Sequence, residues 1–268
     1  MRTLVPLILA PLILAVAIAA AAQAEETLVE AQVLNGWQTD TGTQMTGLRL
    51  QLAPGWKTYW RSPGDAGIPP QFDWSGSTNV KSARIHWPAP HVFTTNGLRS
   101  IGYSGEVVLP VELTPRDPSA PMRLVGQVDI GVCSDICVPA SVRVDAALMA
   151  PGARDAAIDT ALAARPLSAR KAGLKSVTCR IDPIKDGLRI QAELVLPPTG
   201  GTEVLVIEAG SPEIWVSEPV VSRDGARLIA SADMVAPSGE PFALDRGALV
   251  LTVLGAKRAV EVLGCPGG

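Results

Sequence analysis

The chain has 268 residues, with 23 Lys and Arg against 26 Asp and Glu and a formal net charge of −3. Nucleic-acid binding needs a basic excess to neutralise phosphates, so this balance argues against nucleic acid as a partner. Hydrophobic residues make up 47% of the chain and charged residues 18%, a composition typical of folded domains and not of disordered ones. The 25 Gly and 23 Pro follow no collagen period and indicate many turns between short strands.

The N-terminus has the pattern of a secretory signal peptide. Met1 and Arg2 lead into an apolar run over residues 4–22, and small residues stand at Ala22 and Ala24. We therefore expect residues 1–24 to be a signal peptide cleaved after Ala24. The alternative is an uncleaved anchor helix, for which the run is barely long enough. No later stretch approaches the length of a membrane helix, so we expect a soluble, exported mature protein.

Residues 25–150 form a strand-rich block that we expect to be one β-sandwich domain. Its strand-like stretches, bounded by Gly, Pro and Asp, are residues 27–35, 45–52, 57–60, 107–114, 124–132 and 138–148. A linker at residues 151–170 follows. Within it, the Ala-rich run DAAIDTALAA at residues 155–164 predicts a short helix that ends before Pro166.

Residues 171–268 repeat the strand-rich pattern and predict a second β-sandwich domain. The two Asp-Gly steps, at residues 186–187 and 224–225, are strong hairpin signals. The expected strands are residues 177–181, 188–196, 203–208, 214–221, 226–233, 248–254 and 258–263. The fold class is therefore all-β, with two immunoglobulin-like sandwiches joined by a short helical connector.

Four cysteines are the most informative residues, because an oxidising compartment favours disulfides and thiol exchange. Cys133 and Cys137 stand four positions apart, and an extended chain would hold their Cα atoms roughly 13 Å apart, beyond disulfide reach. A hairpin with the three-residue loop 134–136 would place the two sulfur atoms opposite each other on neighbouring strands. A bridge across so small a loop stabilises the fold weakly, which suits a reversible redox pair.

Two other interpretations of Cys133 and Cys137 stay open from the residues alone. One is an inert staple that pins a hairpin. The other is a Cu(I) or Zn(II) site with His86 and His91 as further ligands, although two solvated loop histidines describe the stretch HWPAPH equally well. We expect no metal. The chain also lacks a phosphate-binding Gly-rich loop, an HExxH motif and a GxSxG motif, so nucleotide, metalloprotease and hydrolase chemistry have no anchor.

Cys179 and Cys265 bracket the second block, and a bond between them would join its first and last strands. In the chain-entropy model a loop of this length stabilises the fold by roughly 4–5 kcal/mol. A structural disulfide is therefore expected. A second redox pair at an accessible C-terminus, or pairing between molecules, are the alternatives.

Four separated motifs carry a resemblance to a known family. They are PGWKTYWRSPGDAG at residues 54–67, WPAP at 87–90, GYSGEVVLP at 102–110 and VCSDICVP at 132–139. In this order they resemble the N-terminal periplasmic domain of the DsbD/ScsB family of thiol:disulfide interchange proteins, and the ScsB-like branch most of all. The resemblance covers the first block well and the rest of the mature chain more loosely.

The resemblance implies a periplasmic module that passes reducing equivalents from a membrane-embedded thiol electron transporter to exported, disulfide-containing client proteins. Cys133 and Cys137 look like the family's catalytic pair, and family analogy favours Cys137 as the attacking residue. A cap loop covers the cysteines in the family, and the similar region here is residues 97–103, with Tyr103 as the expected shielding aromatic. Tyr59 and Trp60 fall near the segment that lines the site. Core packing is the rival role for Trp60.

Glu106 follows the expected cap and would influence thiol protonation if it folded over the cysteines. Such exchange needs no cofactor. The sequence given contains neither a multi-span membrane domain nor a thioredoxin-like Cys-x-x-Cys, so a separate membrane partner is expected. The competing hypothesis is an exported, non-enzymatic binding or adaptor module with two structural disulfides, and the residues do not decide whether the protein is a protein-disulfide reductase-like enzyme.

Overall fold

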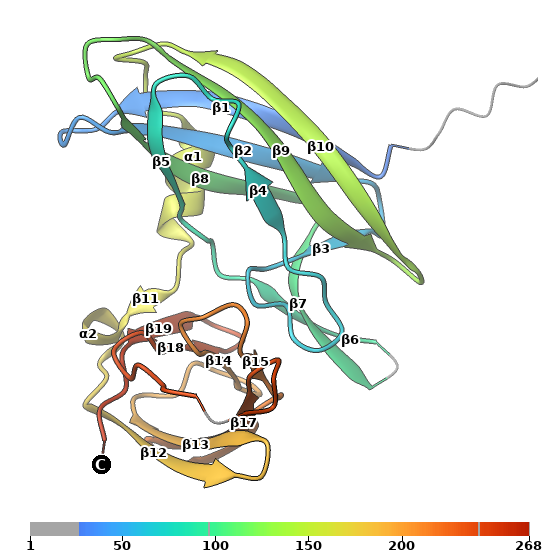
Figure 1. Cartoon of the computed structure of the whole chain (residues 1–268), viewed down its shortest axis with the longest axis vertical. Coiled ribbons are helices and arrows are strands. Elements are labelled where there is room, and N and C mark those ends of the chain that lie inside the picture. The colour runs from blue at the N-terminus through green and yellow to red at the C-terminus, as the bar shows by residue number, and fades with distance from the viewer. Residues whose placement is uncertain (1–26, 96, 241, 268) are drawn as a thin grey trace, which may run out of the picture.

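The computed structural model describes residues 27–95, 97–240 and 242–267, and the expected signal peptide at residues 1–24, with its cleavage after Ala24, lies outside them. Within these ranges the chain forms two β-sandwiches, one above the other, connected by a short helix (Figure 1). The expected all-β class is confirmed. No helix in the described part is long and apolar enough to cross a membrane.

The first sandwich consists of two sheets that face each other. One sheet has the strand order β1-β2-β8-β5, and the other has the order β10-β9-β3-β7-β6, with β4 also paired to β9. The strands are β1 (Val29–Gln38), β2 (Gln44–Leu52), β3 (Lys57–Tyr59), β4 (Gln71–Asp73), β5 (Val80–Ile85), β6 (His91–Thr95), β7 (Leu98–Ser104), β8 (Glu106–Pro115), β9 (Met122–Cys133) and β10 (Cys137–Leu148).

Alternation along the strands creates the core of this sandwich. In β9, Leu124, Val128, Ile130 and Val132 point inward and are at most 3% exposed. The residues between them face the opposite side of the sheet, because successive strand side chains point to opposite faces. Cys133 follows the inward-facing Val132 and is the last outward-facing residue of β9. The cysteine therefore belongs to the outer face of the sheet and not to the core.

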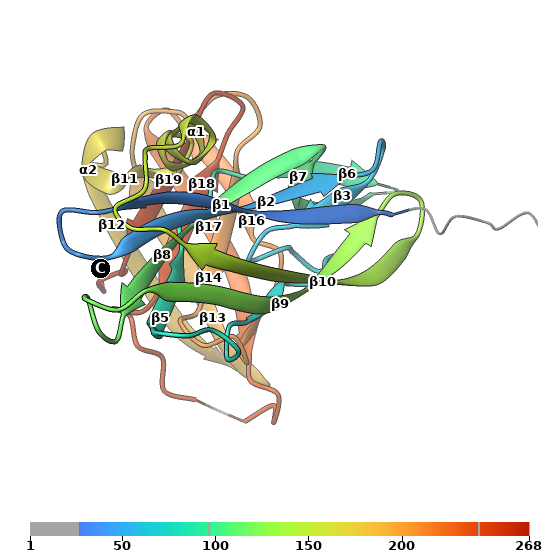
Figure 2. The same cartoon turned by 90° about the horizontal axis from the view of Figure 1, so that it is seen from above.

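Helix α1 (Ala156–Ala163) follows the first sandwich and packs on it. Asp155 caps the helix, since its carboxylate accepts hydrogen bonds from the backbone N–H groups of Ala157 and Ile158 at 2.8 and 3.2 Å. Ile158 is fully buried against Leu34 and its neighbours. The helix lies on the side of the molecule opposite to the β6–β7 hairpin, as two perpendicular views show (Figures 1 and 2).

The second sandwich also has two sheets. Their strand orders are β11-β19-β18-β14 and β12-β13-β17-β15, with β16 also paired to β17. The elements are β11 (Leu167–Ser168), α2 (Ala169–Ala172), β12 (Ser176–Ile184), β13 (Gly187–Val195), β14 (Val204–Glu208), β15 (Trp215–Val216), β16 (Val220–Asp224), β17 (Arg227–Val235), β18 (Val250–Leu254) and β19 (Ala259–Leu263).

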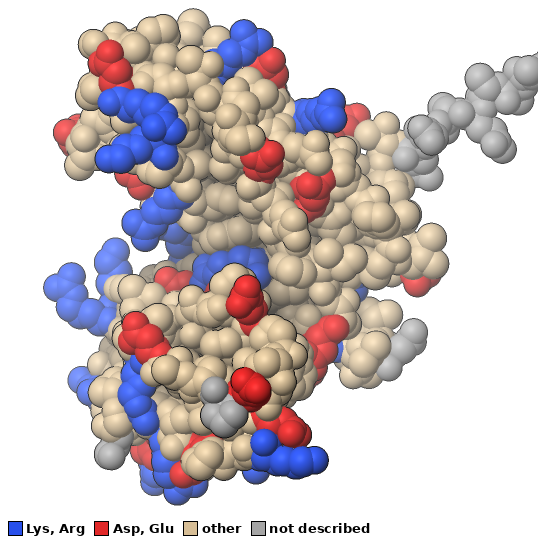
Figure 3. All heavy atoms as spheres, in the orientation of Figure 1, with Lys and Arg blue, Asp and Glu red and all other residues tan. Residues whose placement is uncertain are grey.

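The two domains share an apolar contact. Val204, Val206, Leu254 and Ala259 lie on the outer face of the second domain's sheet, and they are buried in one cluster with core residues of the first domain. The space-filling view shows the two lobes meeting at a hollow waist, with acidic and basic side chains interspersed on the surface (Figure 3). Burial of these apolar side chains thus stabilises the contact between the two domains.

The structure differs from the expected strands in three places, the first of which is the two-residue strand β11 within the expected linker. Strands β4 to β7 occupy residues 71–104, where none was expected, because their side chains show no apolar alternation; β6, for example, is exposed at four of its five positions. The single strand expected at residues 214–221 is two strands, β15 and β16. Pro219 separates them, since proline cannot donate a ladder hydrogen bond.

Candidate functional site

The β9–β10 hairpin brings Cys133 and Cys137 together. Cys133 ends β9, Cys137 begins β10, and the two residues pair directly across the ladder with their Cα atoms 4.1 Å apart. Ser134 N–H donates to Ile136 O at 3.0 Å and closes the three-residue loop. The sulfur atoms are joined in a disulfide. The chain therefore turns in the way that the spacing of the cysteines requires.

The two cysteines differ sharply in exposure. Cys133 is 1% exposed, whereas Cys137 is an exposed residue. The sheet order explains the difference: β9 lies between β10 and β3, while β10 is the outermost strand of its sheet in the described part of the chain. Cys137 is therefore the more accessible residue of the pair.

Tyr59 covers the buried sulfur. Its hydroxyl oxygen lies 2.7 Å from Cys133 Sγ and 3.3 Å from Cys137 Sγ. Lys57 pairs directly with Cys133, and Tyr59 follows two positions later, so the tyrosine projects from the same outer face. A disulfide carries no proton, so only the hydroxyl can donate in these contacts, and Ala66 O at 3.3 Å is a further acceptor for its single hydrogen. Burial raises the pKa of Tyr59, which keeps it a donor at neutral pH.

Two glycines make room for the Tyr59 ring. A Cβ at Gly67 would stand 2.9 Å from Tyr59 Cδ1, and a Cβ at Gly131 would stand 3.0 Å from Tyr59 Cε2. The same Cβ at Gly131 would also stand 3.0 Å from Ile68 Cβ. Side chains at either glycine would push the ring or Ile68 away from the sulfur atoms. Residues 66–68 and Tyr59 thus form one cover over the outer face beside Cys133.

Tyr103 does not shield the cysteines, which corrects the expectation for this residue. It pairs with Thr58, which pairs with Val132, and this row faces the core. Its hydroxyl donates to Pro88 O at 2.8 Å, and burial raises its pKa. The aromatic residue at the sulfur atoms is Tyr59, one position along the neighbouring strand.

Glu106 and Trp60 also lie away from the sulfur atoms. Glu106 belongs to β8 in the opposite sheet, where its carboxylate lies 3.5 Å from Arg49 Nε. Trp60 is fully buried in the core cluster, and the Arg61 guanidinium stacks on it at 4.4 Å from the ring centroid. Trp60 therefore packs in the core, which is the alternative role expected for it from the sequence.

The region expected to form a cap, residues 97–103, lies almost entirely in β7. It forms a hairpin with β6 beside the disulfide face. Lys57 Nζ lies 5.2 Å from the Phe93 ring centroid and 3.4 Å from Thr95 Oγ1, which ties this hairpin to the strand that faces Cys133. The hairpin leaves Cys137 exposed in this structure.

The two histidines lie in different settings. His86 Nε2 donates to the Glu112 carboxylate at 2.9 Å and its Nδ1 accepts from Arg165 at 3.0 Å, while His91 is exposed on β6. Among the described residues, no group of three or more His, Cys, Asp or Glu side chains is arranged to hold a metal ion.

Cys179 and Cys265 form a second disulfide, and both are 1% exposed. Backbone hydrogen bonds hold the C-terminal strand end in place: Cys179 N–H donates to Pro266 O at 2.8 Å, and Cys265 N–H donates to Arg246 O at 2.9 Å. Burial and these bonds favour a structural role for this pair.

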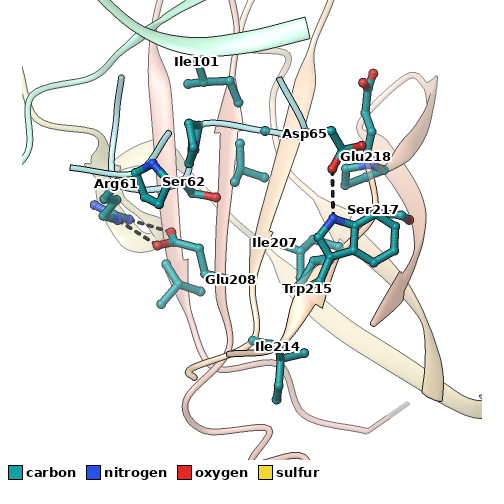
Figure 4. Close-up of a pocket in the computed structure, with 18 of the residues that line it drawn as sticks. Arg61, Ser62, Asp65, Ile101, Ile207, Glu208, Ile214, Trp215, Ser217 and Glu218 are labelled. Atoms are coloured by element: carbon teal, nitrogen blue, oxygen red, sulfur yellow. Dashed lines mark hydrogen bonds and ion pairs between the residues drawn. The ribbon is translucent and has the colours of Figure 1, made fainter. Parts of the chain in front are cut away.

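One cavity lies between the domains and not at the sulfur atoms. Its volume is about 630 Å³, and its walls are residues 61–69, which we call the bridging segment, together with residues 204–219 (Figure 4). Residues 66–68 of the same segment contact Tyr59 or Gly131. One segment therefore borders both the cavity and the disulfide.

Comparison with known proteins supports a common origin for the first domain. Residues 24–148 match the family model described as Thiol:disulfide interchange protein DsbD, N-terminal. The structure is similar to the crystal structure of the N-terminal periplasmic domain of ScsB from Proteus mirabilis, with a TM-score of 0.66 and 24% identity over 90% of this chain and 93% of that chain. None of the curated proteins compared with the chain matches it.

Proposed function

Because residues 24–148 of this chain belong to the DsbD N-terminal domain family, we propose that the protein exchanges disulfides with other exported proteins through Cys133 and Cys137. The observation that carries this proposal is the asymmetry of the pair. Cys137 is an exposed residue, whereas Cys133 is buried under a tyrosine hydroxyl. A purely structural disulfide does not require one exposed and one buried cysteine, whereas an exchange reaction with sequential attack and resolution does.

The reduced protein acts on a client in two steps. The Cys137 thiolate attacks one sulfur of the client disulfide, so a mixed disulfide forms and the other client sulfur leaves as a thiolate. The Cys133 thiolate then attacks Cys137 Sγ, which restores the intramolecular disulfide and releases the second client thiolate. Two electrons pass from the protein to the client, and no cofactor takes part.

The oxidised protein must be reduced again. We assign this step to a dithiol partner that is embedded in the membrane and reacts on its periplasmic side. Its thiolate attacks the exposed Cys137 Sγ and expels the Cys133 thiolate; a second partner thiolate then resolves the mixed disulfide. The support is the family of the first domain and the surface of the site. Ile136 and Ile68, at 67% and 45% exposure, provide apolar surface near the reactive sulfur for a partner to cover.

The test is a redox titration of the Cys133–Cys137 pair. The protein is equilibrated with a glutathione or dithiothreitol series, its free thiols are alkylated, and the fraction reduced is measured by mass spectrometry. A reduction potential in the range of shuttle proteins is expected, whereas a value below about −300 mV would indicate a structural bridge and favour the non-enzymatic adaptor.

A trapping experiment identifies the attacking cysteine. Cys133→Ser should accumulate a stable mixed disulfide on Cys137 with a disulfide-containing test protein, because the resolving thiol is missing. Cys137→Ser should accumulate much less, because its remaining thiol is buried. Equal trapping by both variants would contradict the assigned roles.

A further inference from the structure

The bridging segment, residues 61–69, is attached to the second domain at one end and covers the disulfide at the other. We propose that the second domain holds this segment in place over Cys133 and thereby directs exchange to Cys137, with Asp65 and Trp215 as positioning residues. This inference rests on the proposed exchange function and adds a role for the second domain in it.

The first attachment is an ion-pair cluster at Arg61. Its guanidinium donates to both carboxylate oxygens of Glu208, at 2.9 and 2.8 Å, and to Glu261 at 2.7 Å. The three side chains are 23–30% exposed, so solvent screens them less than pairs on the open surface. Arg61 also stacks on the buried ring of Trp60, which fixes the start of the segment to both domains.

The second attachment lies four residues further along. Trp215 Nε1–H donates to the Asp65 carboxylate at 3.1 Å, and Figure 4 shows the indole of β15 lying under this carboxylate at the mouth of the cavity. Nearby, Arg99 Nη1 of β7 lies 2.7 Å from Glu218 Oε1, which connects the same two regions a second time. Both contacts join residues more than 100 positions apart, so they depend on how the domains dock.

The covering end begins directly after Asp65. Ala66 O lies 3.3 Å from the Tyr59 hydroxyl, Gly67 lies against the Tyr59 ring, and Ile68 lies against Gly131 beside Cys133. A displacement of Asp65 therefore reaches the cover within one to three residues. Extended chain spans about 3.3 Å per residue, so the anchor and the cover cannot move independently over such a short distance.

The cavity explains why the anchors matter. About 630 Å³ of unfilled space lies between the bridging segment and residues 204–219, beside the Arg61–Glu208 and Asp65–Trp215 contacts (Figure 4). Continuous apolar packing would hold a segment through many small contacts, but here the space leaves the polar anchors as the main restraint on that side. Ile101 N–H of β7 donates to Pro63 O at 2.9 Å and holds the segment as far as Pro63. Without the anchor at Asp65, the residues that follow have room to withdraw from Tyr59, and Ile68 loses its position over Gly131.

Withdrawal would change which sulfur reacts. With the cover in place, an incoming thiolate bonds to Cys137 Sγ and Cys133 leaves as a thiolate. With the cover displaced, Cys133 Sγ also becomes reachable, and attack there expels the Cys137 thiolate instead. The mixed disulfide then forms on Cys133 instead of Cys137, where the surrounding strands leave little room for a client.

The experiment measures the reactivity of each cysteine with a small probe. The Cys133–Cys137 bond of the full chain is reduced, the protein is pulsed with iodoacetamide, and alkylation of each thiol, which releases iodide, is quantified by peptide mapping. In the unaltered protein Cys137 should react about tenfold or more faster than Cys133. Asp65→Ala and Trp215→Phe, which remove the hydrogen bond, should each raise the Cys133 rate by about tenfold and leave the Cys137 rate unchanged.

Two controls separate positioning from general damage. Asp65→Asn keeps an oxygen that accepts from the indole, so it should restore the low Cys133 rate. Arg227→Ala removes an exposed ion pair with Glu193 in the second domain and should have no effect. In a variant that has unfolded, the reductant would also reach the buried Cys179–Cys265 disulfide, so alkylation of either freed thiol would reveal the unfolding, and the remaining variant then decides.

The inference is overturned if Asp65→Ala and Trp215→Phe leave the Cys133 rate at its original value, or if they accelerate both cysteines equally. The probe needs no client and no membrane partner. The positioning role can therefore fail while exchange with a test protein succeeds, and exchange can fail while the positioning role is observed.

Discussion

Replacing Tyr59 by Phe removes one oxygen atom from the site and leaves the ring that covers Cys133. That oxygen lies 2.7 Å from Cys133 Sγ and 3.3 Å from Cys137 Sγ. When the disulfide is reduced, a Cys133 thiolate in the same place accepts a hydrogen bond from the hydroxyl. Burial raises the pKa of Tyr59, so the hydroxyl does not compete by ionising. The substitution should therefore destabilise the thiolate relative to the thiol.

The magnitude follows from the charge on the acceptor. A hydrogen bond to a charged group contributes about 1.5–3 kcal/mol, and one pKa unit corresponds to about 1.4 kcal/mol, so Tyr59→Phe should raise the pKa of Cys133 by about 1–2 units. A less acidic thiol is also a poorer leaving group. Glutathione should accordingly reduce the disulfide of the variant about tenfold more slowly when it attacks Cys137.

The pKa is best measured in a Cys137→Ser background, where Cys133 is the only thiol at the site, from the ultraviolet absorbance of its thiolate as the pH is varied. Tyr103→Phe is the matched control. It removes a buried tyrosine hydroxyl from the same domain, but one that donates to Pro88 O at 2.8 Å and belongs to the core row. It should lower stability and leave the Cys133 pKa unchanged. A Cys133 pKa that is the same with and without the Tyr59→Phe substitution would refute the reasoning.

Three further outcomes are expected. Gly131→Ala places a Cβ 3.0 Å from Ile68 Cβ, so chemical denaturation should show a loss of about 1–3 kcal/mol, and Cys133 should alkylate faster; unchanged stability and reactivity would contradict the close contact. Replacing Cys179 and Cys265 together by Ala should lower the unfolding free energy by about 4–5 kcal/mol and leave the potential of the first pair unchanged, whereas a shifted potential would mean that the pairs are coupled. Burial lowers the pKa of His86, so the stability it contributes is present above its unfolded-state pKa of about 6.5 and is lost as pH falls through the lower folded-state value. The thermal midpoint should drop between about pH 7.5 and about pH 5.5, and less in His86→Gln; an equal drop in both proteins would assign the effect to other groups.

The parts of the fold that alternate clearly in the sequence were predictable. Strand β13 begins at Gly187, the second residue of the Asp186-Gly187 turn signal, and every second residue from Ile190 to Leu194 is fully buried. Strands β4 to β7 were not predictable, because their residues carry no period of two: β6 is exposed at four of its five positions, whereas β7 is buried at four consecutive positions, residues 100–103. They are strands because neighbours far along the chain pair with them, as β4 pairs with β9.

The candidate site also has one part that the sequence predicts and one part that it does not. The spacing of Cys133 and Cys137 predicts the hairpin, since the interaction is local. The choice between Tyr59 and Tyr103 as the covering residue depends on the register of β3 against β7, which joins residues more than 40 positions apart. Tyr103 pairs with Thr58 and faces the core, whereas Tyr59 pairs with Gly102 and faces the sulfur atoms. A shift of one residue would exchange these faces, and no local pattern determines it.

Strand order is the first of two causes of the unequal exposure of the two cysteines. A pair placed across two internal strands would bury both sulfur atoms, and no partner thiolate could reach either one. A pair placed on a free two-stranded ribbon would expose both, and the intermediate could form on either sulfur. Here β9 lies between β3 and β10, whereas β10 has no further neighbouring strand among the described residues. Cys133 is accordingly buried and Cys137 is exposed. Residues 66–68 then complete the cover on the outer face, which the sheet cannot protect by itself. The anchors at Asp65 and Arg61 consequently bear on the chemistry, although neither residue touches a sulfur atom.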